Sequence, residues 1–136
     1  MTEWKPITFA PYRGAILLCD FDMARVPPEF DKRRQAIVIS ITSLNHKHAQ
    51  APGICTLVPT SSKEPRTIGP EDVLIPAGKY WSFSEDSWVR AKNITTISHS
   101  RLSLLHKGGR PASTEFLDAT DMARVEIAIK HAMGIP

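Results

Sequence analysis

The feature that most constrains the fold of this chain is a series of short, β-branched apolar segments separated by turn residues. Such segments, bounded by Pro, Gly and polar clusters, are typical of β-strands. Parallel pairing would require crossover connections of about a dozen residues, and the sequence between these segments lacks helical periodicity. The pattern therefore predicts antiparallel pairing in a small barrel or sandwich. The expected strands are 15–21, 36–44, 54–58, 72–75 and 88–97.

Turn residues set the expected ends of these strands. Pro59 lacks a backbone N–H and is expected to stop the third strand, while residues 76–78 close the fourth. Residues 79–82 fit either a short strand or a helical turn. Residues 108–111, which hold two glycines and a proline, predict a loop or hinge.

One helix is expected, at residues 119–133. Asp118 or Thr120 can cap its first turn, and acids near its start complement the helix dipole. Gly134 and the proline at the end of the chain stop it. The apolar residues at helical spacing are Met122, Val125, Ile129, Ala132 and Met133.

Length and composition predict one globular domain over residues 1–136. A chain of this size, with 42% apolar residues, buries a core without a disulfide or a metal. Cys19 and Cys55 lie in apolar runs and are expected to be buried and reduced. No apolar run approaches the roughly 20 residues that cross a bilayer, and no secretory signal is visible. We therefore expect a cytoplasmic protein that does not bind membranes.

The positive charge is concentrated in one part of the chain. The net charge is +3, but residues 87–114 hold five Lys or Arg and no acid, so the remaining residues sum to −2. Residues 32–34 form a second basic cluster. Clustered cations on a mildly acidic domain suit a polyanion such as RNA, although a solvated surface would also tolerate them.

Common catalytic and metal motifs are missing from the sequence. There is no Gly-rich phosphate loop, G-x-S-x-G, C-x-x-C or H-E-x-x-H pattern. His46 and His48 lie in an expected loop without a neighbouring acid or cysteine, and a structural metal site needs four ligands. We expect neither a metal nor a cofactor.

Four segments, in order, resemble the MazF/PemK family of toxins. Residues 14–21 are similar to the family's opening strand, G-x-[IV]-x-x-x-D-F, and residues 29–40 to its loop acid, basic residue and strand ending in Ser. Residues 57–62 match an apolar strand closed by Pro and hydroxyl residues, and residues 87–97 the strand before the C-terminal helix. The resemblance covers about residues 13–134 and leaves residues 1–12 as an N-terminal extension.

The resemblance implies a mainly β, α+β fold, a small SH3-like antiparallel barrel with a C-terminal α-helix. It further implies a homodimer in the bacterial cytoplasm that cleaves single-stranded RNA without a metal and is silenced by a cognate antitoxin.

The same resemblance implies the site residues. The family's essential Arg falls on Arg34, its hydroxyl residue on Ser61, and its loop acid on Glu29. A shift of one residue would substitute Arg33 or Thr60. Gln35 stands where the family usually has Pro. The residues expected to bind RNA are Lys32, Arg33, Ser62, Lys63, Arg90 and Lys92.

These residue types suit metal-free RNA cleavage, in which the substrate's 2′-hydroxyl attacks the adjacent phosphorus. A guanidinium offers forked donors to phosphate oxygens, a hydroxyl adds a donor, and Glu29 is a candidate base. Trp81 and Trp88 could stack on bases or belong to the core.

Two other functions remain open from the sequence. A CcdB-like toxin of the same fold would bind a protein such as gyrase through its C-terminal helix, and an inactive barrel would only bind RNA. Arg34 with Ser61, together with the basic 87–114 stretch, favours the nuclease.

Overall fold

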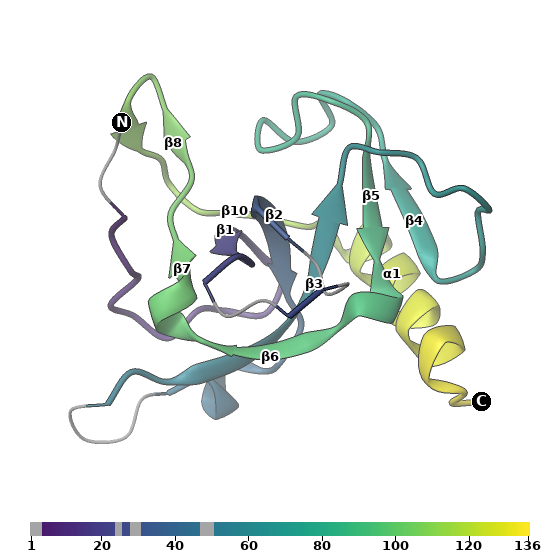
Figure 1. The fold of residues 1–136 in the computed structure, drawn as a ribbon, viewed down its shortest axis with the longest axis horizontal. Coiled ribbons are helices and arrows are strands. Elements are labelled where there is room, and N and C mark those ends of the chain that lie inside the picture. Colours follow the sequence, from purple (N-terminus) through teal and green to yellow (C-terminus); the bar gives the residue numbers. More distant parts are fainter. Residues whose placement is uncertain (1–3, 24–25, 28–30, 47–50) are drawn as a thin grey trace.

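The computed structural model describes residues 4–23, 26–27, 31–46 and 51–136, which form a curled antiparallel half-barrel with one C-terminal helix (Figure 1). This confirms the expected fold class. The strands are β1 (Ala15–Asp20), β2 (Arg33–Val38), β3 (Ile54–Ser61), β4 (Asp72–Ile75), β5 (Ser87–Arg90), β6 (Thr95–Ser98), β7 (Leu102–Ser103), β8 (His106–Lys107), β9 (Arg110–Pro111) and β10 (Glu115–Phe116). The helices are the 3₁₀ turns η1 (Thr42–Leu44), η2 (Ala91–Asn93) and η3 (His99–Arg101), and α1 (Ala119–Met133).

The long strand β3 organises the sheet. The strand order is β10-β1-β2-β3-β5-β4, with β6 also paired to β3 and β7 to β1. β3 pairs with β6 through Leu57 and with β5 from Thr60 onward. Pro59 therefore lies where the partner on this edge of β3 changes from β6 to β5. Its missing N–H removes no ladder bond there. The prediction that Pro59 ends the strand is wrong for this reason.

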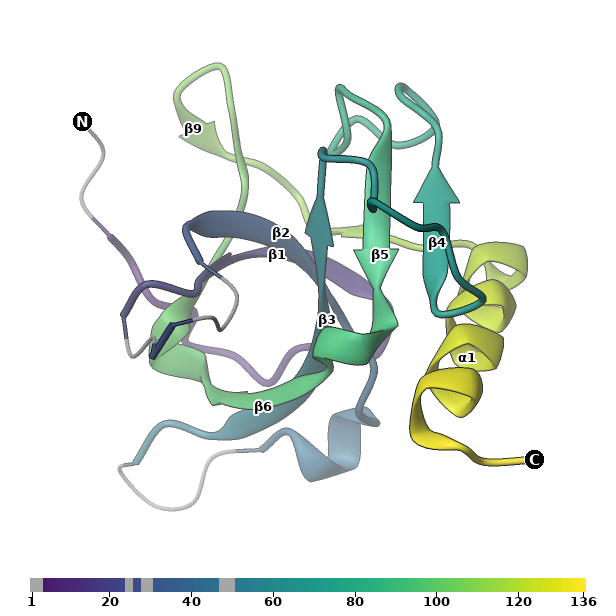
Figure 2. The ribbon, with the colours of Figure 1, turned by 45° about the vertical axis from the view of Figure 1, so that its right-hand side comes forward.

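The expected strand 88–97 is in fact two strands. β5 pairs with the end of β3 and β6 with its beginning, and η2 connects them. Both strands pair with the same edge of β3, but at different positions along it, so the chain has to bend between them. Figure 2 shows η2 beside α1 at this bend.

The second strand begins and ends earlier than expected. β2 starts at Arg33 because Arg33 and Arg34 pair with Asp20 and Cys19 of β1. It ends at Val38, and residues 42–44 form η1 instead of strand. The buried Asn45 side chain stabilises this turn, since its amide donates to the carbonyls of Pro11 and Ser40. Residues 79–82 form turns.

Helix α1 forms where the sequence predicts it. The Asp118 carboxylate accepts the N–H of Asp121 at 2.8 Å, and Gly134 ends the helix in the left-handed conformation at φ 68°. The helix packs against β4 and η2. Within the described ranges, no helix is both long and apolar enough to cross a membrane.

The sheet buries apolar side chains on both faces. Alternate residues such as Ile16, Ile37 and Val58 pack with α1, while Leu17, Val38 and Leu57 pack inside the curl with Cys19 and Cys55. This explains why the strands read as continuous apolar runs. Both cysteines are free, as expected, and burial raises the pKa of each to about 12.

Candidate functional site

The sheet brings Arg34 and Ser61 together across 27 positions of sequence. Ala36 of β2 is paired with Pro59 of β3, so the same register places Arg34 opposite the last residue of β3. Arg34 Nη1 donates to Ser61 Oγ at 3.1 Å. The two side chains expected to act together are therefore in direct contact.

Asp31 orients the Arg34 guanidinium. Arg34 Nε donates to the Asp31 carbonyl at 2.7 Å, and Nη2 donates to its carboxylate at 2.9 Å. The Arg34 side chain is 21% exposed, so these bonds lie in a partly water-excluded place where charge-assisted bonds are strong. Asp31 is not among the residues expected from the sequence, although an acid three residues before the key Arg was a usable signal.

Ser61 is placed to donate its hydroxyl hydrogen. Its oxygen accepts from Arg34 and also from the backbone N–H of Lys63 at 3.2 Å. Both lone pairs of the oxygen are thereby used. Among the described residues, Ser61 has no hydrogen bond in which its hydroxyl is the donor, so that hydrogen is available to a molecule in the pocket.

The two neighbours that the sequence left as alternatives make different contacts. Thr60 is 2% exposed, and its hydroxyl donates to the carbonyl of Gln35 at 2.8 Å. Arg33 Nε is 3.2 Å from Asp20, and its guanidinium lies 4.7 Å from the centre of the Trp4 ring. Neither therefore reproduces the contact between Arg34 and Ser61.

A polar pocket of about 220 Å³ surrounds the pair. It is built by the start of β2, the end of β3 and the segment that leads into β5. Gln35 ties these parts together, because its Nε2 donates to the carbonyl of Ser82 at 2.9 Å. The residues lining the pocket are Lys32, Arg33, Arg34, Gln35, Thr60, Ser61, Ser62, Phe83, Ser84, Glu85 and Ser87.

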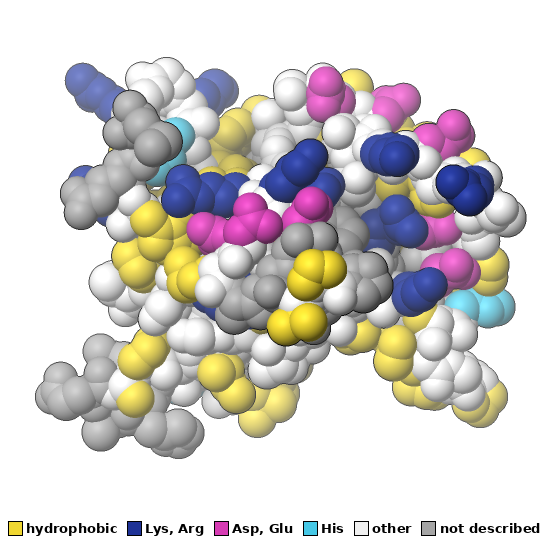
Figure 3. All heavy atoms as spheres, viewed as in Figure 1, with side chains coloured by type: hydrophobic (Ala, Val, Ile, Leu, Met, Phe, Trp, Pro, Cys, Tyr) yellow, Lys and Arg dark blue, Asp and Glu magenta, His cyan; other side chains and the backbone are white. Residues whose placement is uncertain are grey.

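A second hollow of about 480 Å³ adjoins the first at Ser61. Lys63, Arg66 and Arg90 line it, so cations continue past the end of β3. Arg90 is also 3.1 Å from Asp72. Figure 3 shows one face of the molecule, where Lys and Arg side chains gather across the upper half with acids among them. The arrangement suits an extended anion that crosses Ser61.

Among the candidates that the structure describes, Lys92 lines neither this pocket nor the adjoining hollow. Glu29 lies outside the described residues, as does His48. Lys92 lies in η2 against α1, beyond the end of β5 that faces away from Ser61. The chain turns at η2 after Arg90, and a role of Lys92 in RNA binding stays a prediction.

The two tryptophans that the sequence offered as base-stacking candidates differ in burial. Trp88 is 9% exposed and pairs with Ser61 in the sheet, whereas Trp81 is 37% exposed. Trp81 is the one whose ring is available to a ligand.

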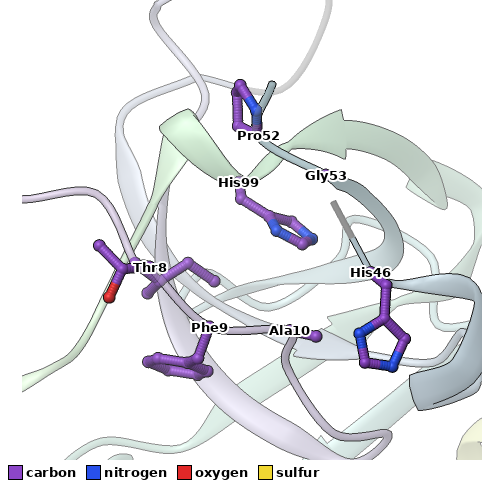
Figure 4. Close-up of a pocket in the computed structure, with 8 residues that line it drawn as sticks. Thr8, Phe9, Ala10, His46, Pro52, Gly53 and His99 are labelled. Atoms are coloured by element: carbon purple, nitrogen blue, oxygen red, sulfur yellow. The ribbon is translucent and has the colours of Figure 1, made fainter. Parts of the chain in front are cut away.

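A different pocket, of about 310 Å³, lies near the other end of β3 (Figure 4). Phe9 and Pro52 line it together with His46 and His99. Burial lowers the pKa of His99, against a hydrogen bond with the backbone of Ile54, so this histidine is neutral at pH 7. Within the described part of the chain, no cluster of three metal-ligating side chains occurs.

A model of PemK-like, MazF-like toxins of type II toxin–antitoxin systems matches residues 12–133. No curated protein matches the chain. Similar solved structures include MazF from Deinococcus radiodurans, form I, at 21% identity and a TM-score of 0.65, over 93% of this chain and 98% of that one.

Two complexes are also similar. An endoribonuclease with its cognate antitoxin from a mycobacterial species has 20% identity and a TM-score of 0.63, over 93% of this chain and 98% of that one. MazE–MazF from Deinococcus radiodurans, form II, has 20% identity and a TM-score of 0.61, over 94% of this chain and 99% of that one. At these identities the structures establish a shared fold.

Proposed function

Because the chain belongs to the PemK-like, MazF-like toxins of type II toxin–antitoxin systems, we propose that it cleaves single-stranded RNA at the Arg34–Ser61 pocket. The observation that carries the proposal is the 3.1 Å contact between these side chains in a polar pocket rimmed by cations. The similar structures named as endoribonucleases support it.

The proposed reaction uses the RNA's own 2′-hydroxyl and no metal. The 2′-oxygen loses its proton and bonds to the adjacent phosphorus, and the bond to the 5′-oxygen of the next nucleotide breaks. The 5′-oxygen takes up a proton. The products are a 2′,3′-cyclic phosphate and a free 5′-hydroxyl.

Arg34 and Ser61 would stabilise the charge that develops on the phosphorane oxygens. The guanidinium is already oriented by Asp31 and presents donors in a fixed plane, so little reorganisation is needed when the transition state forms. The hydroxyl hydrogen of Ser61 supplies a further donor from the opposite strand. Thr60 would support the site through the backbone of Gln35.

We propose Glu29 as the base that accepts the 2′-hydroxyl proton, two residues before the Asp31 that holds Arg34. Asp31 is a poor candidate for the base because its carboxylate already accepts a hydrogen bond from Arg34 Nη2 at 2.9 Å. Lys32, Arg33, Ser62, Lys63 and Arg90 would position the RNA backbone around the scissile bond.

The proposal includes the partners that the family implies. The protein would act as a homodimer in a bacterial cytoplasm, and a cognate antitoxin would compete with RNA for the basic surface. An acidic segment that orders on binding is the expected competitor.

The test is incubation of the purified protein with single-stranded RNA in EDTA, beside Arg34→Ala and the exposed helix variant Lys130→Ala. We expect wild type and Lys130→Ala to cleave and Arg34→Ala to lose cleavage. Intact RNA that is nevertheless bound would indicate a non-catalytic barrel. Neither cleavage nor binding would favour a protein target, and undiminished cleavage by Arg34→Ala would overturn the assignment.

A further inference from the structure

The short hairpin of β8 and β9 is exposed along its whole length and contacts Trp81. β8 and β9 are joined by Gly108 and Gly109 at φ 63° and 79°, which makes a tight two-residue turn. All residues from 106 to 111 are exposed. In Figures 1 and 2 the hairpin projects from the same end of the molecule as the loop between β4 and β5.

The charges of the hairpin oppose its own folding. Lys107 and Arg110 are directly paired across the two strands, and like charges in that position destabilise a hairpin. None of the ion pairs between residues that the structure describes includes either cation. An anion between them would relieve the repulsion.

The hairpin is in contact with an exposed aromatic ring. Lys107 Nζ lies 5.5 Å from the centre of the Trp81 ring. Glu115 holds Trp81 in place, because its carboxylate accepts the backbone N–H of Trp81 at 3.2 Å and the N–H and hydroxyl of Ser82 at 3.0 and 2.6 Å. The ring is therefore presented on a fixed backbone.

The same backbone is part of the catalytic pocket. The carbonyl of Ser82 accepts Gln35 Nε2, and Phe83 lines the pocket next to Arg34 and Ser61. We propose that Trp81, Lys107 and Arg110 form a second RNA subsite for a nucleotide that flanks the scissile bond. The base stacks on Trp81 and its phosphate lies between the two cations. This inference rests on the proposed function for RNA as the ligand and for the place of the scissile bond.

The test measures binding of RNA whose 2′-hydroxyls are methylated, so that cleavage cannot occur. A short oligonucleotide spans only the scissile bond, and a longer one extends on both sides. Lys107→Glu is compared with Lys130→Glu, which makes the same charge change on α1, and Trp81→Ala with Trp81→Phe.

Lys107→Glu and Trp81→Ala should each weaken binding of the longer RNA about tenfold. Binding of the short RNA should be unchanged. Lys130→Glu and Trp81→Phe should bind like wild type. Lys107→Glu should also reduce the salt dependence of binding by roughly 0.7 in log–log slope. The three substituted residues are exposed, so the four variants should fold, which unfolding in urea checks.

Three outcomes overturn the subsite. The first is an equal effect of Lys107→Glu and Lys130→Glu on binding of the longer RNA. The second is an equal loss of binding for the short and the longer RNA. For the third, polyglutamate is titrated in parallel as an acidic peptide, and the outcome is that Lys107→Glu weakens its binding but leaves RNA binding unchanged. Cleavage by the wild type is measured separately with unmodified RNA. If the wild type cleaves and the variants bind the longer RNA normally, the subsite is wrong and the nuclease stands. If the wild type does not cleave but the variants bind the longer RNA more weakly, the nuclease is wrong and an RNA-binding site at the hairpin stands.

Discussion

Arg34 Nη1 lies 3.1 Å from Ser61 Oγ, which joins the second residue of β2 to the last residue of β3. Each side chain is also held from its own side, Arg34 by Asp31 and Ser61 by the backbone N–H of Lys63. Donors fixed in this way cost little to align when charge develops on a bound phosphate.

We expect Arg34→Lys to be nearly as damaging as removal of the side chain. Lysine keeps the charge but loses the planar fork that contacts both Asp31 and Ser61. Single-turnover cleavage should fall by about 10²–10³-fold, while RNA binding changes little. A lysine variant that cleaves at the wild-type rate would show that charge alone suffices.

Ser61 and Thr60 should respond differently to loss of the hydroxyl. Ser61→Ala removes a donor to the phosphate, so cleavage should fall by about 10²-fold with little change in stability. Thr60→Val removes the buried bond to the Gln35 carbonyl and should lower the free energy of unfolding by about 1–3 kcal/mol.

Cleavage rates of the folded proteins and urea unfolding curves measure the two effects. If Thr60→Val is inactive but stable and Ser61→Ala is active, the catalytic hydroxyl belongs to Thr60 and not to Ser61.

Asp31→Asn should separate binding from catalysis. The Asp31 carboxylate competes with phosphate for Arg34 Nη2, and removing its charge should tighten RNA binding a few-fold. The guanidinium is then less firmly oriented, so the rate of cleavage should fall about tenfold. Titration with non-cleavable RNA and single-turnover rates test this. Weaker binding, or a rate equal to wild type, would contradict the orienting role.

Lowering the pH should weaken the packing of α1, because it removes the charge of Asp121. This carboxylate is 1% exposed and accepts from Tyr80 Oη at 2.7 Å, with Lys79 Nζ at 2.7 Å and Arg124 Nη1 at 3.0 Å. Burial raises the pKa of Asp121, but these partners outweigh it and hold the pKa below 3.8. The stabilisation is therefore complete above pH 3.8 and is lost as the pH falls through the lowered pKa.

Urea unfolding over a pH series measures this dependence. Tyr80→Phe, which keeps the ring in the core, should lose about 1.5–3 kcal/mol at neutral pH. The difference from wild type should shrink as Asp121 is protonated. A difference that stays constant into acid would mean that Asp121 does not supply the dependence.

Much of the fold was predictable from local sequence. The helix at 119–133 follows from apolar spacing and from its caps, which act within a few residues. The strand ends were not predictable in this way. Whether Pro59 ends β3 depends on which strand lies beside it, and that strand is about 30 residues further along the chain.

The sequence by itself determined the residue types of the site, the antiparallel character of the sheet and the uneven distribution of charge. Only the tertiary structure decided which member of each candidate pair makes the contact between guanidinium and hydroxyl. Successive residues of a strand point to opposite faces, so the pairing register placed Arg34 against Ser61 and turned Arg33 toward Asp20. Register depends on contacts between strands, and a single strand's sequence does not contain them.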